Sequence, residues 1–312
     1  MKSNCIVAVQ TTISPECPEA GKDSIPADEH PTKNPQSTRW EDQTISNAFM
    51  FNAVMKNKNL CLQLLRLVLP ELNIQRIKYP QVEKTINIAI DAKSVRLDVY
   101  TKDPVGRIYD VEMQIIDTLE LPRRSRYYGG MVDQNELQKG QKYYELPKTF
   151  IIFICLTDIF NAGLSKYTFR NMCVEDPSVE MGDDLIHIFL NIKGSGTDVS
   201  PELGAFLHYV ENPDTTITTP FIEQVKEAVK VARQDSSLRL QYASWNATMD
   251  DVEERGVRRG EKKGIAIGKT QGEDTFADLG RKLFSSGRQD DLLRAFDDKD
   301  FRHSLMKEFG IS

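Results

Sequence analysis

The sequence predicts an α/β fold, in which a mixed central sheet is flanked by helices and followed by a mainly helical C-terminal tail. The first observation is the order of segments: an amphipathic helical stretch, three short segments rich in β-forming residues, a second helical stretch and an apolar strand. The second is the apolar run 150–156, which does not alternate with polar residues and is therefore typical of a central strand covered on both faces. The third is the helical, strongly charged pattern after Pro220.

Length, charge and cysteine content narrow the class of protein. The chain has 312 residues, 40 Lys and Arg against 46 Asp and Glu, and 40% hydrophobic positions, which is typical of a soluble globular protein with one large or two modest domains. The five cysteines are odd in number and include no CxxC pair, which argues against a disulfide framework or a structural zinc site. No apolar run is long enough to cross a bilayer or to form a secretory signal. We therefore expect a cytoplasmic protein without a membrane segment.

The elements can be assigned in chain order. Residues 1–40 hold five of the fourteen prolines among Ser, Thr, Glu and Asp, which predicts a disordered leader. Between residues 45 and 69 apolar side chains recur at spacings of three and four, which predicts one or two amphipathic helices that end at Pro70. A helix is expected over 123–139, and strands are expected at 85–90, 95–101, 107–115, 150–156, 167–174 and 187–191.

The segment 220–312 is expected to form a charged helical tail. It contains glycines at an interval of four, namely Gly256, Gly260, Gly264, Gly268 and Gly272. Each glycine inside a helix costs about 1 kcal/mol relative to alanine, so the stretch 256–272 is either half of a closely packed helix pair or a loose linker. The tail does not build a core of its own, so we expect it to self-associate and to join two chains in a homodimer. Residues 264–270 imitate a phosphate-binding loop, but the glycine spacing is too short and no strand precedes it, so no nucleotide cofactor is expected.

Basic residues are concentrated in the middle of the chain. Residues 76–170 carry 15 Lys and Arg against 12 Asp and Glu, a net charge of 15 − 12 = +3 in a protein whose net charge is −6. An anionic partner such as nucleic acid would meet this region most readily. The excess is small, and ordinary scatter explains it as well.

The residues that point to chemistry lie in the segment 95–114. Two predicted strands are joined there by a Pro-Val-Gly loop, in which glycine can take the left-handed conformation. In antiparallel register the facing positions add up to 210, which places Asp98 opposite Glu112 and Arg96 opposite Gln114, all on one face. Facing carboxylates have Cβ atoms about 5 Å apart and repel each other unless a cation lies between them.

A divalent metal site would satisfy this arrangement. Mg²⁺ prefers oxygen ligands and keeps several waters, so the two carboxylates and a backbone carbonyl, that of Met113, would form half of its coordination shell. The metal would polarise a phosphate and acidify a water, which Gln114 could orient, while Arg96 could bind a phosphate oxygen. Polar residues that alternate on a solvent-facing sheet produce the same pattern, so the spacing alone leaves a purely structural role open.

Several blocks within residues 42–212 resemble the PD-(D/E)XK nuclease superfamily, and within it the nuclease-family transposases and recombination-promoting nucleases. These blocks are FMFNAVM at 49–55, SVRLDVYTKD at 94–103, YDVEMQ at 109–114, LPRRSRYYGGMVD at 121–133 and FIIFICLTDIF at 150–160. The resemblance implies a restriction-endonuclease-like core over residues 41–219, with Asp98 and Glu112 as ligands of Mg²⁺, or of Mn²⁺ in its place. It also implies that Gln114 stands where many members of the superfamily carry lysine.

Two departures from the family pattern concern this core. The expected pattern has an acidic residue just before the FMF block, whereas here Asn47 is followed by Ala48, so a helical acid or cap is missing. Glutamine instead of lysine at position 114 keeps a group that can position water, but it removes a positive charge beside the scissile phosphate.

A cluster of arginines and tyrosines opens the helix that follows the third strand. Arg123, Arg124, Arg126 and Tyr127 could grip a DNA backbone, because arginine and tyrosine both supply phosphate contacts. Arg123 and Tyr127 would share one helix face, and Arg124 and Tyr128 the next, so part of the cluster should pack against the sheet. DNA contact and packing are equally open.

We therefore predict a Mg²⁺-dependent DNA endonuclease of the transposase-like kind, which hydrolyses phosphodiester bonds and whose cleavage could promote recombination. Asp98 and Glu112 would hold the metal, and Gln114 would position the water. The alternative is a degenerate member that keeps the fold and serves as a DNA-binding or protein-interaction module. A third class is a scaffold in which the helical tail carries the function.

Overall fold

The computed structural model describes residues 39–86, 95–114 and 120–311 of the chain. All but the last two residues of the predicted leader 1–40 therefore lie outside the described residues. Of these two, Trp40 begins a short 3₁₀ helix, η1 (Trp40–Asp42), and is buried in the main hydrophobic core. Its indole N–H donates a hydrogen bond of 3.1 Å to the carbonyl of Arg233. Trp40 thus belongs to the folded domain rather than to a leader.

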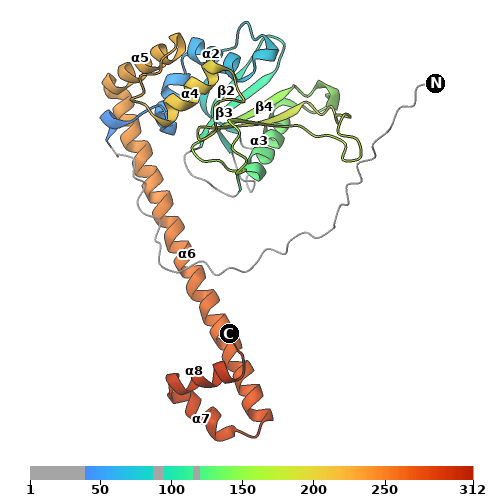
Figure 1. Ribbon diagram of the computed structural model, residues 1–312, viewed down its shortest axis with the longest axis vertical. Coiled ribbons are helices and arrows are strands. Elements are labelled where there is room, and N and C mark those ends of the chain that lie inside the picture. The colour runs from blue at the N-terminus through green and yellow to red at the C-terminus, as the bar shows by residue number, and fades with distance from the viewer. Residues whose placement is uncertain (1–38, 87–94, 115–119, 312) are drawn as a thin grey trace, which may run out of the picture. The chain divides into compact units, whose positions relative to one another are not determined.

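A six-stranded mixed sheet forms the centre of the fold (Figure 1). Its strands are β1 (Gln81–Ile86), β2 (Val95–Lys102), β3 (Ile108–Gln114), β4 (Thr149–Cys155), β5 (Lys166–Phe169) and β6 (Leu185–Asn191). They lie in the order β1-β2-β3-β4-β6-β5, with β4 parallel to both β3 and β6 and the other neighbours antiparallel. Every residue of β4 is buried, which confirms the prediction of a central strand covered on both faces.

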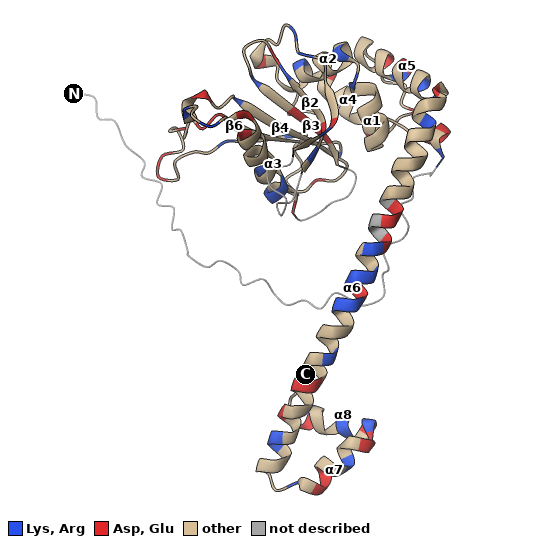
Figure 2. Ribbon diagram, turned by 180° about the vertical axis from the view of Figure 1, so that it is seen from behind, with Lys and Arg blue, Asp and Glu red and all other residues tan. Residues whose placement is uncertain are grey.

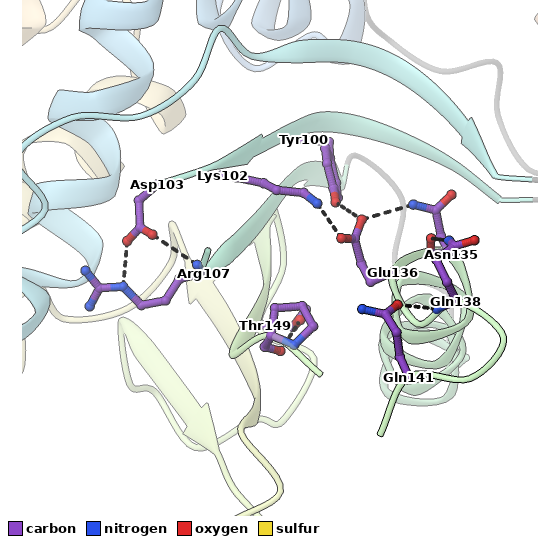
Figure 3. A network of polar contacts seen from close by, with 10 residues as sticks. Tyr100, Lys102, Asp103, Arg107, Asn135, Glu136, Gln138, Gln141 and Thr149 are labelled. Atoms are coloured by element: carbon purple, nitrogen blue, oxygen red, sulfur yellow. Dashed lines mark hydrogen bonds and ion pairs between the residues drawn. The ribbon is translucent and has the colours of Figure 1, made fainter. Parts of the chain in front are cut away.

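The β2–β3 hairpin has the predicted register. Val99 pairs with Val111, so facing positions add up to 210. Gly106 in the connecting loop has a φ of 93°, which is the left-handed conformation that glycine adopts without strain. The carboxylate of Asp103 fixes this loop, because it accepts hydrogen bonds from the backbone N–H of Arg107 at 3.0 Å and from the Nε of the same residue at 2.5 Å (Figure 3).

Helices cover both faces of the sheet. One face is covered by α1 (Ala48–Met55), α2 (Lys58–Val68), α4 (Pro201–Glu211) and α5 (Pro220–Gln234), whose apolar side chains share one core with β3 and β4. The other face is covered by α3 (Leu121–Glu136), whose buried residues belong to a second core (Figure 1). Two short 3₁₀ helices, η2 (Pro70–Leu72) and η3 (Tyr143–Glu145), lie in the connections. The sheet is therefore the middle layer of three, as predicted from the order of the segments.

The start of α1 is fixed by a side-chain cap. The side-chain oxygen of Asn47 accepts a hydrogen bond of 3.1 Å from the backbone N–H of Met50, which satisfies one of the free donors at the helix N-terminus. Ala48, the first residue of the helix, packs against the main core. The cap that the family pattern suggested was missing at position 48 is thus supplied by Asn47.

The C-terminal region is mainly helical, as predicted, and contains α6 (Ser236–Ser285), α7 (Gln289–Asp297) and α8 (Lys299–Glu308). The predicted boundary at residue 220 does not mark the end of the main core, because α5 and the beginning of α6, up to Tyr242, bury side chains in it. The glycine-spaced segment 256–272 lies inside α6, and a Cβ added to any of its five glycines would meet no atom within 4 Å. This stretch is therefore a helix rather than a loose linker.

The last part of the chain has a small core of its own. The end of α6 packs with α7 and α8 around Leu279, Leu283, Ala295 and Leu305. The prediction that the tail builds no core was wrong here, because these residues come from three helices and no single helical period reveals them. Within the described part of the chain, no helix combines the length with the apolar character that crossing a membrane requires.

Candidate active site

Asp98 of β2 and Glu112 of β3 meet where the backbone ladder between the two strands ends. The last ladder pair is Val99 with Val111. One position further along, the backbone N–H of Asp98 donates a hydrogen bond of 2.9 Å to Glu112 Oε1 instead of to a backbone carbonyl. The side chain of Glu112 is only 1% exposed, and Asp98 is partly buried. The structure thus brings together the two carboxylates that the hairpin register had paired.

Asp98 has further contacts with α1 and β3. Its Oδ1 accepts a hydrogen bond from Asn52 Nδ2 at 3.4 Å, and its Oδ2 accepts one from the backbone N–H of Met113 at 3.3 Å. Both bonds are long, so the carboxylate keeps lone pairs for another ligand. The Oδ1 of Asn52 is buried and has no hydrogen-bond partner among the described residues. It adds an unpaired oxygen beside Asp98.

A third acidic residue, Asp110, completes this carboxylate group. It lies on the face of β3 that carries Glu112, and it pairs with Tyr100 across the hairpin. Asp110 is fully buried, and neither of its carboxylate oxygens has a hydrogen-bond partner among the described residues. Such a group destabilises a fold and therefore calls for a functional explanation.

Burial raises the pKa of all three acids, and repulsion adds to the shift for Glu112 and Asp110. Burial raises the pKa of Asp98 above its usual range, although hydrogen bonds from Asn52 and Met113 oppose the shift. Burial, followed by the charge of Asp98, raises the pKa of Glu112 and that of Asp110 well above their usual ranges. The negative charge of the group is therefore poorly compensated, and a bound cation would stabilise its ionised form.

Arg124 of α3 is the one cationic residue in the described chain that is hydrogen-bonded to a carboxylate of this group. Its Nη2 donates to Glu112 Oε2 at 3.1 Å, and its Nη1 donates to Gln114 Oε1 at 2.8 Å. Its Nε donates to the hydroxyl of Tyr128 at 2.8 Å. The guanidinium carbon also lies 5.0 Å from the ring centre of Tyr128 and 5.6 Å from that of Phe153. These contacts hold the guanidinium against the site.

The other basic residues at the start of α3 face solvent. Arg123, Arg126 and Tyr127 are exposed, whereas Arg124 and Tyr128 face the sheet. Arg123 and Arg126 form no ion pair or hydrogen bond with the rest of the described chain. Figure 2 shows the basic character of this end of α3. The sequence left DNA contact and packing equally open for this cluster. In the structure Arg124 and Tyr128 pack inward, and the other members of the cluster face outward.

Arg96 lies at the margin of the site. Its predicted position opposite Gln114 is not formed as a ladder pair, because the β2–β3 ladder ends first. On the other side of β2, Arg96 pairs with Thr85 of β1. Its guanidinium is 3.9 Å from the carboxylate of Glu83 and is largely open to solvent. Its charge nevertheless contributes to lowering the pKa of Asp98 against the effect of burial.

A lysine-rich pocket of about 240 Å³ lies beside the carboxylate group. Its lining residues are Lys78, Tyr79, Gln81, Lys84, Tyr100, Thr101 and Lys102. Tyr100, two residues from Asp98 along β2, connects the pocket to α3 because its hydroxyl donates a hydrogen bond of 2.8 Å to Glu136, which also pairs with Lys102 (Figure 3). The ammonium of Lys84 lies 3.6 Å from the centre of the Tyr100 ring. Positive charge therefore borders the carboxylates on the β1 side.

The donor atoms of the carboxylate group suit a hard divalent cation. The groups that face each other are carboxylates, with the unpaired oxygens of Asp110 and Asn52 next to them, and Mg²⁺ prefers oxygen ligands. Within the described ranges, no three Asp, Glu, His or Cys side chains are grouped closely enough to enclose a metal ion by themselves. An ion held by Asp98 and Glu112 would therefore need a backbone carbonyl, such as that of Met113, together with waters or a phosphate oxygen, which Mg²⁺ accepts readily.

This geometry agrees with a match to a known family. A family model for PD-(D/E)XK nuclease family transposases matches residues 48–254, well over half of the chain. The chain belongs to this family. The match runs from α1 into α6, so the mixed sheet and its helices form the restriction-endonuclease-like fold of the PD-(D/E)XK nucleases, and α5 is part of it. No curated protein and no solved structure matches the chain.

Two residues of this PD-(D/E)XK site were missed by the sequence reasoning. Asp110 lies two positions before Glu112, so the period of a strand places both on one face, and this signal was present in the sequence. Asn52 approaches Asp98 from α1, 46 positions earlier in the chain, and no spacing rule connects them. Only the packing of α1 on β2 brings them together.

Proposed function

We propose that this protein is a metal-dependent DNA endonuclease in which Asp98 and Glu112 hold Mg²⁺ or Mn²⁺. The observation that supports this function is the buried carboxylate group at the end of the β2–β3 ladder, whose negative charge is poorly compensated. The metal would supply charge neutralisation, polarisation of the phosphate and acidification of a water. The carbonyl of Met113 and waters would complete its coordination shell.

Gln114 would position the attacking water. It follows Glu112 by two residues and lies on the same face of β3. Because Arg124 donates to its side-chain oxygen at 2.8 Å, the orientation of the Gln114 amide is fixed. A fixed amide can hold a water in one place with little loss of entropy on substrate binding.

The DNA would cross the site between the start of α3 and the lysine-rich pocket. Arg123 and Arg126 on one side, and Lys78 and Lys84 on the other, would contact phosphates, which supply much of the affinity in protein–DNA complexes. Figure 2 shows acidic positions on β2 and β3 and basic positions on α3. Tyr79 is 78% exposed at the pocket, so its ring can stack on an unpaired base.

A degenerate DNA-binding module remains the second candidate, and one observation favours it. The hydrogen bond from Arg124 to Glu112 already places a positive charge of the protein on one of the two carboxylates. A family member that has lost its metal would need such an internal counter-charge, because an unpaired buried carboxylate is costly.

The two functions are separated by incubating the purified full-length protein with supercoiled plasmid and Mg²⁺ or Mn²⁺. The nuclease should convert supercoiled DNA to open-circular or linear forms, and EDTA should stop the reaction. DNA binding that weakens with salt, without any metal-dependent nicking, would support the module and overturn the nuclease. Asp98→Asn serves as the control for contaminating nucleases, since it should remove the activity.

We further propose that α6 joins two copies of the chain. A Cβ added to any of its five glycines between residues 256 and 272 would meet no other described part of the chain within 4 Å. Each of these glycines lowers helix stability by about 1 kcal/mol relative to alanine. A second helix that packs closely against this stretch would offset that cost. Light scattering should give a dimer mass for the full chain and a monomer mass after truncation at residue 254, where the family match ends. A monomeric full-length protein would contradict this proposal.

A further inference from the structure

Position 114 in this protein carries no charge, although the chemistry proposed for it develops negative charge on a phosphate. A neutral glutamine can position a water, but it cannot stabilise that charge as a lysine would. The Nη1 of Arg124 lies 2.8 Å from Gln114 Oε1. A lysine side chain extends one atom beyond the position of that amide oxygen, so the guanidinium of Arg124 occupies the place that the ammonium of a lysine at position 114 would reach.

We infer that Arg124 supplies from α3 the positive charge that position 114 lacks, and that it contacts a non-bridging oxygen of the scissile phosphate. This inference rests on the proposed nuclease function. The charge is well held, since Arg124 is bound to Glu112, Gln114 and Tyr128 and lies over the ring of Phe153. Such fixed donors stabilise developing charge effectively, because they need not reorganise during the reaction.

Arg124 also keeps the capacity to bind a phosphate. Arginine has five N–H donors, and the contacts to Glu112, Gln114 and Tyr128 use one each from Nη2, Nη1 and Nε. Two N–H groups are therefore available. The side chain is 36% exposed, so solvent, and with it a DNA strand, can reach the guanidinium. The side chain of Arg281, near the end of α6, is 75% exposed, makes none of these contacts and lies outside the proposed site, which makes it the control.

The structure allows one competing explanation, in which Arg124 only neutralises the buried Glu112. The two explanations differ in what a relocated charge should do. If Arg124 acts on the phosphate, a lysine at position 114 should restore the rate when Arg124 is replaced by alanine. A methionine at position 114, which has similar bulk and no charge, should not restore it.

The experiment compares single-turnover nicking of supercoiled plasmid by the full-length protein at saturating protein and Mg²⁺. It includes the wild type, R281A, R124A, R124A/Q114K and R124A/Q114M, all at a temperature where circular dichroism shows every variant to be folded. We expect R124A to be slower than the wild type by about 10²-fold, which is typical for the loss of one transition-state donor. R281A should stay within about threefold of the wild type, and R124A/Q114K should recover at least about tenfold over R124A, unlike R124A/Q114M. Because all variants are folded, a purely structural role of Arg124 would not produce this difference.

Several outcomes would overturn the inference. R124A nicking as fast as R281A would show that the charge is not used. R124A/Q114K as slow as R124A/Q114M would show that charge at this position is not what was lost. If R124A does not fold, Arg124→Lys takes its place in the experiment. This variant keeps the charge, so its nicking rate should stay within about tenfold of the wild type. A loss of nicking as complete as that of Asp98→Asn would contradict the inference. Absence of nicking by the wild type with either metal would overturn the proposed function and this inference together. A wild type that nicks while R124A is unaffected would overturn only the inference.

Discussion

The backbone N–H of Asp98 donates a hydrogen bond of 2.9 Å to the carboxylate of Glu112. The bond holds one carboxylate oxygen of Glu112 against the strand that carries Asp98, so the backbone of the hairpin sets the separation of the two acids. A metal site built on them would be preorganised by the fold.

Glu112→Gln should destabilise the metal-free fold less than Glu112→Ala. The glutamine oxygen can still accept the N–H of Asp98, although its amide nitrogen cannot accept from Arg124, whereas alanine leaves both that N–H and the guanidinium of Arg124 without this acceptor. The difference between the two variants should be about 1–3 kcal/mol in the free energy of unfolding, which urea titration in EDTA measures. An equal loss of stability in both variants would show that the cross-strand bond contributes nothing.

Replacing Arg123 and Arg126 should change the salt dependence of DNA binding without changing the stability of the fold, because both side chains are exposed. Replacing both by alanine should lower the slope of log affinity against log salt by about 2, since each phosphate contact contributes roughly 0.9. Fluorescence anisotropy over a series of salt concentrations measures this slope. Arg258→Ala on α6 is the control and should keep the wild-type slope. An unchanged slope in the double variant would remove these arginines from the DNA path.

Much of this fold could be predicted because its signals are local. The non-alternating run in β4 indicated a strand covered on both faces, and the Pro-Val-Gly loop with Gly106 in the left-handed conformation fixed the register that pairs Val99 with Val111. That register in turn brought Asp98 and Glu112 together. Helix periodicity separated Arg124 and Tyr128 from Arg123 and Tyr127, but it did not say which of the two faces packs against the sheet.

The remainder depends on packing between distant segments. Asn52 reaches Asp98 only because α1 packs against β2. The predicted boundary at residue 220 assigned α5 to the tail, because the amphipathic pattern of a helix does not say which core the helix joins. The expected opposition of Arg96 and Gln114 assumed that the ladder continues to the strand ends. It stops at the pair of Val99 with Val111.

Tyr79 should contribute to the binding of unpaired DNA strands. Its ring is 78% exposed beside three lysines of the pocket, and stacking of a base on such a ring is worth about 1–3 kcal/mol. Tyr79→Ala should therefore weaken binding of a single-stranded oligonucleotide more than binding of a duplex of the same length. Tyr144→Ala, at a tyrosine that is 83% exposed in η3, is the control and should change neither affinity. Equal effects of the two variants would exclude base stacking at Tyr79.

His187 should make the protein less stable in mild acid. It joins β6 to α3, where its Nδ1 lies 2.6 Å from Ser125 Oγ, and burial lowers its pKa below the usual value. The unfolded chain therefore protonates the His187 imidazole more readily than the folded chain does. The stability contributed by the neutral, buried imidazole is fully present above about pH 6.5, and it is lost as the pH falls toward the pKa of the folded state. His187→Gln should lose less stability than the wild type between about pH 7 and pH 5, measured as the urea midpoint. His303→Gln, at an exposed position of α8, is the control and should follow the wild type. Identical pH profiles for all three proteins would rule out this role of His187.

Asp98→Asn should separate chemistry from stability. Without metal, the variant should be as stable as the wild type or more stable by up to about 1 kcal/mol, because the repulsion between Asp98 and Glu112 is relieved. It should nevertheless fail to nick plasmid. Asp290→Asn, at an exposed position of α7, is the control and should retain both properties of the wild type.

The shift in melting temperature caused by Mg²⁺ tests the carboxylate pair most directly, and it requires no DNA substrate. A ligand that binds only the folded state stabilises it by about 2.7 kcal/mol at a concentration of 100 times its Kd, which corresponds to a rise of several degrees. The wild type and Asp290→Asn should show this rise in Mg²⁺ relative to EDTA, and Asp98→Asn should show little or none. Equal Mg²⁺ shifts in the wild type and Asp98→Asn would mean that the metal does not bind at Asp98 and Glu112.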